Sequence, residues 1–259
     1  MDRLDPVAIG AWRKRLPERS AWGIHKALRQ VLNHAVRIKL LDENVAVLVP
    51  NPEPKRREVE AFDTIELLEA VGAEMSEAYS QLPVFTALTG LRPEEWIALE
   101  RRDVDRKAGI VHVRRVFTAG AVKLVGKNSR SLRAVPLPTR ALEAVDAIPP
   151  RLDTRLVFPA KRGGHLNLDT WRGREWTPAL KAAGISQRGP YALRHTYATW
   201  SIAAGVELYT LARFMGTSVE QLDKTYTHLM PDAIERTRAR LDEFVRLFPE
   251  RSQEADASG

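Results

Sequence analysis

The stretch that decides the fold, residues Tyr191–Leu229, reads YALRHTYATWSIAAGVELYTLARFMGTSVEQLDKTYTHL. Gly205 and Gly216 divide it into three helical segments, because glycine commonly follows the last residue of a helix. The predicted helices cover residues 191–204, 208–215 and 219–226. Arg194 lies near the start of this stretch and Tyr226 near its end. A guanidinium and a phenol in one segment suggest phosphate chemistry, which needs further groups from the rest of the chain.

The sequence on either side of this stretch is mostly helical as well. Apolar residues at helical spacing, with capping residues, glycine or proline at the ends, predict the other helices. These cover residues 6–16, 21–41, 63–75, 76–89, 92–99, 138–147, 169–183 and 231–247. Strand-like runs at residues 110–117, 121–125 and 132–137 are expected to form a small antiparallel meander. The predicted fold class is mainly α with a small antiparallel β-sheet (α+β).

A proline-rich, basic segment at residues 49–62, VPNPEPKRREVEAF, interrupts the helical pattern. Such a composition favours an extended linker. We therefore expect a thin helical domain over residues 1–52, a linker over 53–61, a main domain over 62–249 and a disordered polar tail over 250–259. In the thin domain, helix 21–41 is expected to bury an apolar stripe that includes Ile24 and Val31.

The composition of the 259 residues favours a polyanionic partner. The formal net charge of +7 suits binding to nucleic acid. There are no cysteines, which excludes disulfides, thiolate metal sites and a cysteine nucleophile. The six histidines are scattered, so we expect no metal site. No apolar run reaches the ~20 residues that span a bilayer, and we expect a cytoplasmic protein with no membrane partner.

Four groups could carry chemistry, and each also has a plainer interpretation. Arg92 precedes a helix start that suits an anion site, but it could simply pair with Glu95 at the surface. Lys127 lies in a basic turn that could reach into a groove or be merely solvated. Arg194 could be held by a carboxylate in the core. Tyr226 could be a packing residue, since a phenol with a pKa of ~10 is a weak nucleophile without nearby cations.

The order and context of these groups resemble the tyrosine recombinases, the phage integrase family. Residues 89–105, TGLRPEEWIALERRDVD, look like the family's first arginine box, and residues 125–137, VGKNSRSLRAVPL, look like its lysine hairpin. Residues 156–164, LVFPAKRGG, resemble the stretch after that hairpin. Residues 191–199, YALRHTYAT, resemble the second arginine box, and residues 215–229, MGTSVEQLDKTYTHL, the nucleophile box. The resemblance extends over residues 1–247, where the first helices look like the end of the family's core-binding domain.

The resemblance implies a site-specific DNA recombinase that breaks and rejoins DNA through a 3′-phosphotyrosyl intermediate, with no metal and no other cofactor. Arg92 and Arg194 would clamp the scissile phosphate through bidentate contacts and stabilise the charge of the transition state. Lys127 would protonate the leaving 5′ oxygen, and Tyr226 would attack the phosphorus. Glu95, on the same helix face as Arg92, would give structural support to a neighbouring cation.

Two positions depart from the family's pattern. Tyr191 stands where the second arginine box usually begins with histidine, and Thr217 stands where histidine or tryptophan commonly follows the glycine of the nucleophile box. We place both in the catalytic set as hydrogen-bond donors to phosphate, although neither replaces imidazole as a proton shuttle. His195 and His228 are the neighbouring imidazoles. Both are expected to be structural, since the i+1 position points His195 off the face of Arg194.

The expected partners are double-stranded DNA and other copies of the chain, as a homotetramer on two DNA sites, with accessory DNA-bending proteins as further partners. The side chains expected to contact DNA are Lys26, Arg29, Lys127, Arg130 and Arg133. Helix 231–247 is expected to pack against a neighbouring copy through its apolar residues Ile234, Leu241, Phe244 and Val245.

Other functions stay open at this point. A non-catalytic, decayed integrase that acts as a DNA-binding protein is favoured by the substitutions at Tyr191 and Thr217 and by the missing first helices of the core-binding domain. A type IB topoisomerase would share the chemistry but would relax supercoils as a monomer. A basic globular protein without a DNA role is the remaining alternative. The target sequence cannot be read from the chain, because base contacts are spread over several elements.

Overall fold

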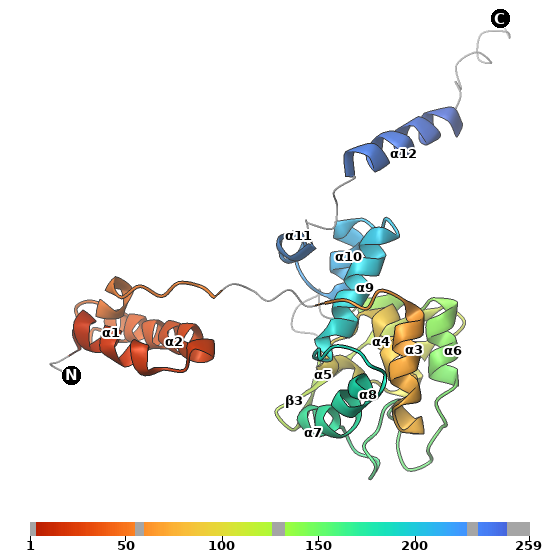
Figure 1. Cartoon of the computed structure of the whole chain (residues 1–259), viewed down its shortest axis with the longest axis horizontal. Helices are drawn as coiled ribbons and strands as arrows, with labels where there is room; N and C mark the ends of the chain where they lie inside the picture. The colour runs from red at the N-terminus through yellow and green to blue at the C-terminus, as the bar shows by residue number, and fades with distance from the viewer. Residues whose placement is uncertain (1–3, 55–59, 126–132, 227–232, 248–259) are drawn as a thin grey trace, which may run out of the picture. The chain divides into compact units, whose positions relative to one another are not determined.

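The computed structural model describes residues 4–54, 60–125, 133–226 and 233–247. The chain divides into two compact units, Met1–Glu58 and Val59–Gly259, and the division falls within residues 53–61, which are predicted as a linker (Figure 1). The first unit holds two helices and a 3-10 turn, namely α1 (Pro6–Arg15), α2 (Glu18–Arg37) and η1 (Val45–Leu48).

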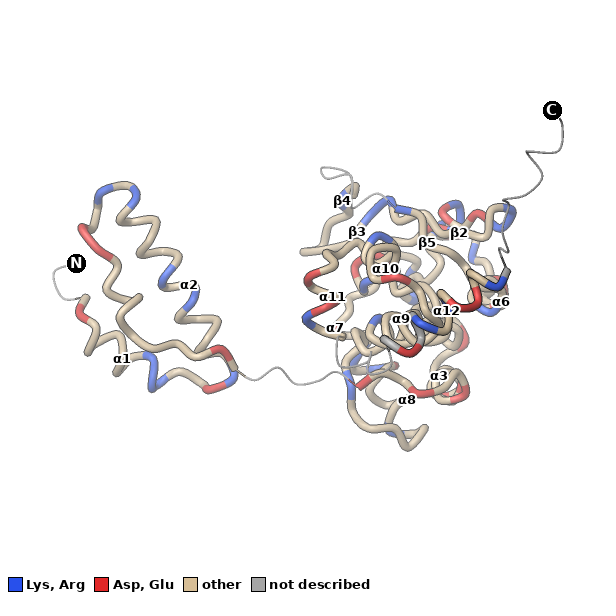
Figure 2. The backbone as a smooth tube through the Cα atoms, turned by 90° about the horizontal axis from the view of Figure 1, so that it is seen from above, with Lys and Arg blue, Asp and Glu red and all other residues tan. Residues whose placement is uncertain are grey.

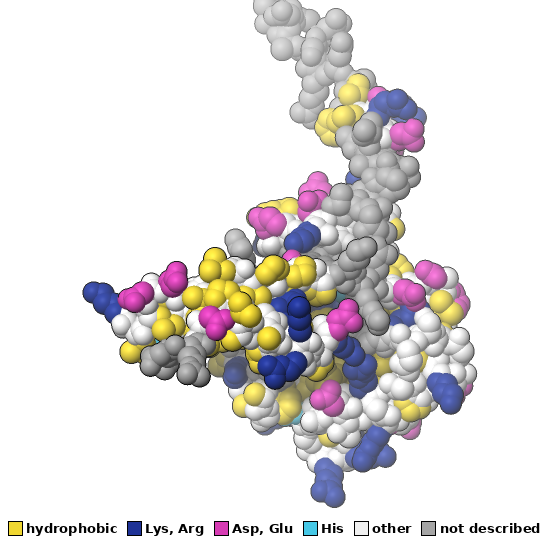
Figure 3. Space-filling view, turned by 60° about the vertical axis from the view of Figure 1, so that its left-hand side comes forward, with side chains coloured by type: hydrophobic (Ala, Val, Ile, Leu, Met, Phe, Trp, Pro, Cys, Tyr) yellow, Lys and Arg dark blue, Asp and Glu magenta, His cyan; other side chains and the backbone are white. Residues whose placement is uncertain are grey.

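The core of the first unit is small. It consists of Ile9, Leu32, Ala46 and Val49. The expected burial of the apolar stripe on α2 is wrong for Ile24 and Val31, which are 39% and 64% exposed. Among the described elements of this unit, α2 packs against α1 and η1 only, so side chains on its other faces stay in solvent. Figure 3 accordingly shows hydrophobic side chains at the surface of the first unit, which comes forward in that view.

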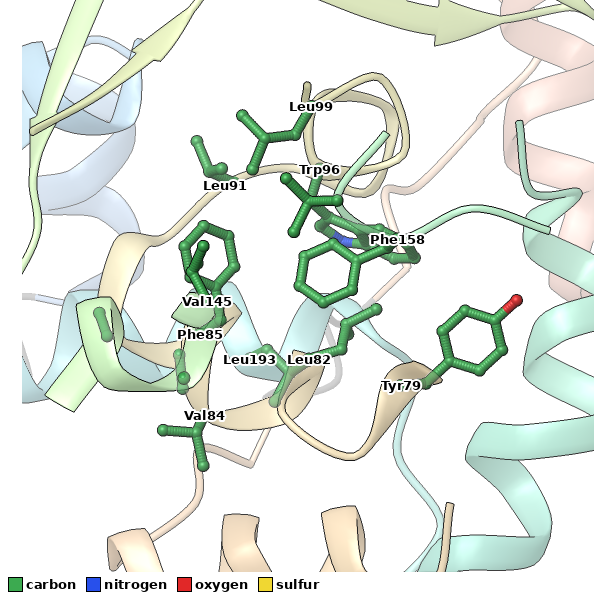
Figure 4. Close-up of a cluster of buried hydrophobic side chains, with 14 of the residues drawn as sticks. Tyr79, Leu82, Val84, Phe85, Leu91, Trp96, Leu99, Val145, Phe158 and Leu193 are labelled. Carbon is green, nitrogen blue, oxygen red and sulfur yellow. The ribbon is translucent and has the colours of Figure 1, made fainter. Parts of the chain in front are cut away.

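The second unit is organised around helix α4 (Leu82–Thr89). This helix packs against α3 (Ile65–Ala73), α6 (Thr139–Asp146) and α9 (Tyr191–Ala203), which surround it in Figure 1. Because α4 has neighbours on several sides, nearly all of its side chains are buried. Figure 4 shows this cluster, in which Leu82, Phe85, Trp96, Phe158 and Leu193 come together from four segments of the chain.

The remaining helical elements follow in chain order. They are η2 (Glu77–Tyr79), α5 (Pro93–Trp96), η3 (Arg101–Asp103), α7 (Leu168–Trp171), the π-helical segment η4 (Arg172–Trp176), α8 (Thr177–Ala182), α10 (Leu208–Met215), α11 (Val219–Tyr226) and α12 (Ala233–Leu247). The predicted fold class, mainly α with a small antiparallel component, is confirmed. None of the helices in the described residues is long and apolar enough to cross a membrane.

Two predicted helices are wrong as single elements. The segment 76–89 turns after η2, and α4 then begins with Pro83 in its first turn, where the missing N–H costs no hydrogen bond. The segment 169–183 contains the π-helical stretch η4 between α7 and α8, and Trp176 at its end is fully buried. Both interruptions keep large side chains directed at the same core.

The predicted three-stranded meander is also wrong. The strands β1 (Val104–Asp105), β2 (Ile110–Val113) and β5 (Arg133–Pro136) form one antiparallel sheet, and β3 (Arg115–Thr118) and β4 (Ala121–Leu124) form a separate hairpin. Ala119 and Gly120 both take positive φ in the hairpin turn, so residues 115–124 fold back on themselves and β5 pairs with β2 instead. The register pairs Val113 with Arg133, which places Arg133 at the end of the sheet.

Candidate active site

Glu95 holds the first arginine of the site in place. Arg92 is the N-cap residue of α5, and Pro93 opens that helix. The Glu95 carboxylate accepts the backbone N–H of Arg92 at 2.8 Å and the Nη1 group of its side chain at 3.0 Å. Nη2 of Arg92 donates to the carbonyl of Gly216 at 2.7 Å. One carboxylate therefore fixes both the start of α5 and the arginine side chain.

Arg133 brings a second guanidinium to the same carboxylate from β5. Its Nη1 and Nη2 groups donate to the two oxygens of Glu95 at 3.0 and 2.8 Å, and its Nε donates to the carbonyl of Phe214 at 2.6 Å. The side chains of Arg133 and Glu95 are 6% and 4% exposed. Burial alone would raise the pKa of Glu95, but the interactions with Arg133 and Arg92 outweigh it and hold this pKa below its ordinary value.

This geometry corrects the assignment of Arg133 as a DNA contact. Its guanidinium is buried, and three of its N–H groups are already bonded to Glu95 and Phe214. Arg133 is therefore a positioning residue for Glu95. The sequence could not show this, because the burial of an arginine depends on which strands pair.

Arg194, the arginine of the second box, lies on α9 and is 7% exposed. Its Nη1 donates to the carbonyl of Gly90 at 2.5 Å, and its Nη2 donates to the carbonyl of Met215 at 2.6 Å. Gly90 ends α4 with a φ of +63°, and a Cβ at this position would lie 2.3 Å from the ring of Tyr197. Glycine is thus required where the Arg194 contact is made. The interpretation of Arg194 as a side chain held by a carboxylate does not fit these carbonyl contacts.

Arg92 and Arg194 meet at one turn of the chain. They donate to the carbonyls of Gly216 and Met215, two consecutive residues at the end of α10. Burial, and then the charge of Arg92, lower the pKa of Arg194 to about 10, so it remains protonated at neutral pH. Hydrogen bonds to the described residues use two of the five N–H donors of each guanidinium. Within the described part of the site, the cationic donors therefore exceed the buried Glu95 carboxylate, which suits an anion.

Tyr226, the last residue of α11, is 6% exposed and lies beside α9. Its hydroxyl is 2.6 Å from Nδ1 of His195, the residue that follows Arg194. Burial raises the pKa of Tyr226 to about 12, and the charge of Arg194 opposes that shift. Burial and the charge of Arg194 both lower the pKa of His195. The phenol and a neutral imidazole are therefore hydrogen-bonded at neutral pH.

The structural role expected of His195 stays a prediction, but its contact with the Tyr226 hydroxyl is one that the sequence did not predict. Position i+1 does turn His195 away from the contacts of Arg194, but α11 returns to cover that face of α9 and brings Tyr226 to it. The sequence signal that could have found this contact is the adjacency of His195 to Arg194 in the same box. His228 lies outside the described residues.

The family model described as "Phage integrase family" matches residues 60–232. The chain belongs to the phage integrase family. The matched range contains Arg92, Glu95, Arg133, Arg194 and Tyr226, the residues that the structure brings together. Among the described residues, no cluster of three or more histidine, cysteine, aspartate or glutamate side chains could hold a metal ion.

Curated relatives agree with this membership. The chain is 29% identical over 163 residues to the prophage integrase IntR of Escherichia coli (strain K12), a match that covers 53% of this chain and 40% of IntR. It is 28% identical over 199 residues to the tyrosine recombinase XerA of Saccharolobus solfataricus, covering 76% of this chain and 62% of XerA. The chain thus spans less than two thirds of the length of these two relatives.

Solved structures share the fold. The Tn1549 transposon integrase in complex with a circular intermediate DNA superposes with a TM-score of 0.72 at 16% identity, covering 93% of this chain and 86% of that one. A lambda integrase tetramer bound to a Holliday junction gives a TM-score of 0.63 at 15% identity, covering 84% and 65%. At these identities the likeness shows the fold.

The two positions that depart from the phage integrase pattern both lie at the site. The Tyr191 hydroxyl is 3.3 Å from a carboxylate oxygen of Glu94, and the side chain is 46% exposed. Burial and the charge of Glu94 raise the pKa of Tyr191. Thr217 follows Gly216 and lines a pocket of about 730 Å³ together with Arg133. Their predicted contacts with phosphate stay predictions.

The other residues predicted to contact DNA are only partly described. Lys127 and Arg130 lie outside the described residues. Lys26 lies over the ring of Trp22 at 4.6 Å on α2. Arg29 instead donates three hydrogen bonds to the carbonyls of Ala46, Val47 and Val49, which ties α2 to η1. Its guanidinium thus has a structural role, and the predicted DNA contact is untested. Figure 2 shows lysine and arginine positions spread over both units, including α2.

Proposed function

We propose that this member of the phage integrase family is a site-specific DNA recombinase, which breaks and rejoins DNA through a 3′-phosphotyrosyl bond to Tyr226. One observation carries the proposal. Arg92 and Arg194 donate to the carbonyls of two consecutive residues at the end of α10. The hydroxyl of Tyr226 contacts His195, which follows Arg194 in the chain. Two guanidiniums and a phenol from three distant segments thus converge on one place.

The arginines suit a phosphodiester. Their unused N–H donors can bind its two non-bridging oxygens, and the planar fork of a guanidinium matches that spacing. The charge of these oxygens grows in the pentavalent transition state, so donors fixed in advance by Glu95 and by the 215–216 turn stabilise it without reorganisation. Loss of one such donor is expected to slow the reaction by roughly 10²–10³-fold.

The phenolic oxygen of Tyr226 attacks the phosphorus, and the bond to the 5′ oxygen of the next nucleotide breaks. We assign Lys127 as the acid that protonates this leaving oxygen. The energy of the phosphodiester is retained in the phosphotyrosyl bond, so a 5′-hydroxyl from another duplex can attack it and release Tyr226. No nucleotide cofactor is needed for this exchange.

Strand exchange between two duplexes suits four copies of the chain on two DNA sites, as in the lambda integrase tetramer on a Holliday junction. We assign α12 to the contact between copies. Leu241, Phe244 and Val245 on this helix are 59%, 58% and 68% exposed. Light scattering of the DNA complex should give a tetramer for the wild type and a smaller assembly for Leu241→Asp, whereas an unchanged mass would remove α12 from the interface. Accessory DNA-bending proteins belong to the same proposal as additional partners.

A covalent-trapping experiment tests the function. A pool of duplexes with randomised sequence is nicked on one strand, so that cleavage releases a short fragment and leaves the protein joined to DNA. The wild type should give a protein–DNA adduct stable to denaturation, and Tyr226→Phe should give none. DNA binding without an adduct would favour a non-catalytic integrase. Adducts at every sequence, with relaxation of supercoiled plasmid, would favour a type IB topoisomerase.

A further inference from the structure

The hydrogen bond between Tyr226 and His195 joins the proposed nucleophile to an imidazole that the family's usual pattern does not use for it. The distance from the phenolic oxygen to Nδ1 is 2.6 Å, and the ring centroids are 5.7 Å apart. A proton acceptor must lie within hydrogen-bond reach of the proton that it takes, and this pair satisfies that condition before DNA binds.

Neither of the two unusual positions offers an acceptor to Tyr226. Tyr191 carries a phenol whose pKa is raised, so it holds its proton and its hydroxyl contacts Glu94. Thr217 carries a hydroxyl, which does not accept a proton to form a cation near neutral pH. The chain thus lacks imidazole at the two positions where the family commonly has it. The imidazole of His195 contacts the Tyr226 hydroxyl instead.

We propose that His195 is a catalytic residue of this chain, whose Nδ1 accepts the proton of Tyr226 as the phenolic oxygen attacks the DNA phosphate. The inference rests on the proposed recombinase function and adds a residue to it. The proton is assigned to the phenol and the free lone pair to Nδ1, which leaves the ring's other nitrogen, Nε2, protonated.

The O–H bond of Tyr226 breaks and an N–H bond forms on His195, while an O–P bond forms on Tyr226 and the bond from phosphorus to the 5′ oxygen breaks. That 5′ oxygen takes a proton from the acid assigned above, Lys127. On rejoining, a 5′-hydroxyl attacks the phosphorus, its proton returns to Lys127, and His195 returns its own proton to Tyr226.

Electrostatics decide when this transfer is favourable. Among the described residues, the groups that act on His195 are Tyr226 from α11 and Arg194 on its own helix. Burial, and then the cation of Arg194, lower the pKa of His195 and disfavour a positive charge on the imidazole. In the DNA complex the phosphate bound by Arg194 offsets that cation. The imidazole therefore stays neutral at rest and gains a proton only when phosphate is present, which limits activation of Tyr226 to the bound state.

The test uses the full chain and a nicked duplex recovered from the trapping pool. His195→Asn keeps an acceptor atom near the position of Nδ1 but cannot take a proton. His165→Gln is the matched control, because His165 is also half-buried, has a pKa lowered by burial, and lies against Phe117 outside the site. Single-turnover adduct formation at neutral pH should fall at least ~100-fold for His195→Asn and stay at the wild-type rate for His165→Gln.

The pH profile separates proton transfer from positioning. The wild-type rate should rise as pH passes the lowered pKa of His195 and then stay level. The rate of His195→Asn should keep rising with pH, since water or hydroxide must then take the proton of Tyr226. Added imidazole should restore adduct formation to His195→Ala more strongly at pH values where free imidazole is neutral.

Two results would overturn the role of His195 alone, and a third would overturn the recombinase function together with it. A His195→Asn rate within about threefold of wild type, or a drop with an unchanged pH profile and no imidazole rescue, would reduce His195 to a structural residue. Absence of any adduct with wild-type protein would refute the recombinase function itself, and the role of His195 with it.

Discussion

Replacement of Glu95 by glutamine is the sharpest test of how the site is built. Glutamine keeps the shape of the side chain and an oxygen that can accept the Arg92 backbone N–H, but it removes the charge. The carboxylate is 4% exposed and bonded to Arg133, which is 6% exposed, and to Arg92, which is 27% exposed. The change therefore leaves a buried guanidinium without its counter-ion.

The magnitude follows from that burial. Removal of one partner from a buried ion pair costs about 3–5 kcal/mol of unfolding free energy, because the other charge stays in the interior. In a unit of this size that cost corresponds to a fall in Tm of roughly 6–20 °C. Glu69→Gln is the matched control. Glu69 pairs with Arg140 at 2.7 Å, but these side chains are 45% and 33% exposed, and such pairs contribute about 0–1 kcal/mol.

The pH dependence has a definite sign. The folded pKa of Glu95 is lower than its ordinary value, so the unfolded chain binds more protons at acidic pH. The stabilisation is fully present above the unfolded pKa of about 4.3 and is lost as pH falls through the lower folded pKa. The difference between wild type and Glu95→Gln should therefore be constant near neutral pH and shrink below about pH 4.

The assay is urea unfolding of the full chain at pH 7, followed by tryptophan fluorescence. Trp96 lies on α5 next to Glu95 and is fully buried in the core of the second unit, so its fluorescence reports the unfolding of that unit. The ion pairs of Glu95 with Arg92 and Arg133 do not hold the site together if the unfolding free energy of Glu95→Gln lies within about 1 kcal/mol of wild type. The same conclusion follows if Glu69→Gln lowers the unfolding free energy by as much.

The remaining predictions concern the glycine that ends α4, the proposed general acid Lys127 and the predicted DNA contact of Lys26. Gly90→Ala should lower the unfolding free energy by roughly 2–5 kcal/mol, because a Cβ would lie 2.3 Å from the Tyr197 ring at a φ of +63°. Gly120→Ala, with a φ of +76° and nothing within 4 Å, should cost only about 1–2 kcal/mol in the same urea titration, and equal losses would contradict the packing argument. Lys127→Met should slow adduct formation by roughly 10²–10⁴-fold on ordinary DNA. The defect should be much smaller on DNA with a 5′-thiol leaving group, because that group needs no acid to leave. A similar defect on both substrates would refute the role of Lys127 as the acid. Lys26→Ala should weaken binding to all DNA sequences and reduce the slope of log K against log salt concentration by about 1. Fluorescence anisotropy at several salt concentrations measures this slope. An unchanged slope would show that Lys26 does not contact DNA.

The sequence predicts the helices of the site well because their ends have local causes. Gly216 takes positive φ at the end of α10, Gly205 takes positive φ soon after α9, and these helices begin and end within a residue of prediction. Arg92, Arg194 and Tyr226 are singled out by resemblance to the family's boxes; the structure brings the two arginines to the turn at Met215 and Gly216 and places Tyr226 against His195. Local chemistry fixes these features, so a single sequence contains them.

The sheet and the partners of the charged groups are set by contacts between distant segments. β5 pairs with β2 rather than with the nearer β4, because the β3–β4 hairpin closes on itself. That pairing buries Arg133 against Glu95, so a residue that looks like part of a basic DNA-binding tip becomes internal. The contact of His195 with Tyr226 depends in the same way on how α11 packs on α9, and spacing along the chain does not determine it.

In the proposed reaction, Tyr226 becomes covalently joined to DNA in the site formed by Arg92 and Arg194. Mass spectrometry of the trapped adduct, after digestion of the protein and the DNA, measures this directly. We expect a nucleotide 3′-phosphate on the peptide that contains Tyr226, and its loss in Tyr226→Phe and in Arg194→Ala. A nucleotide attached to any other residue, or an adduct that persists in Tyr226→Phe, would contradict it.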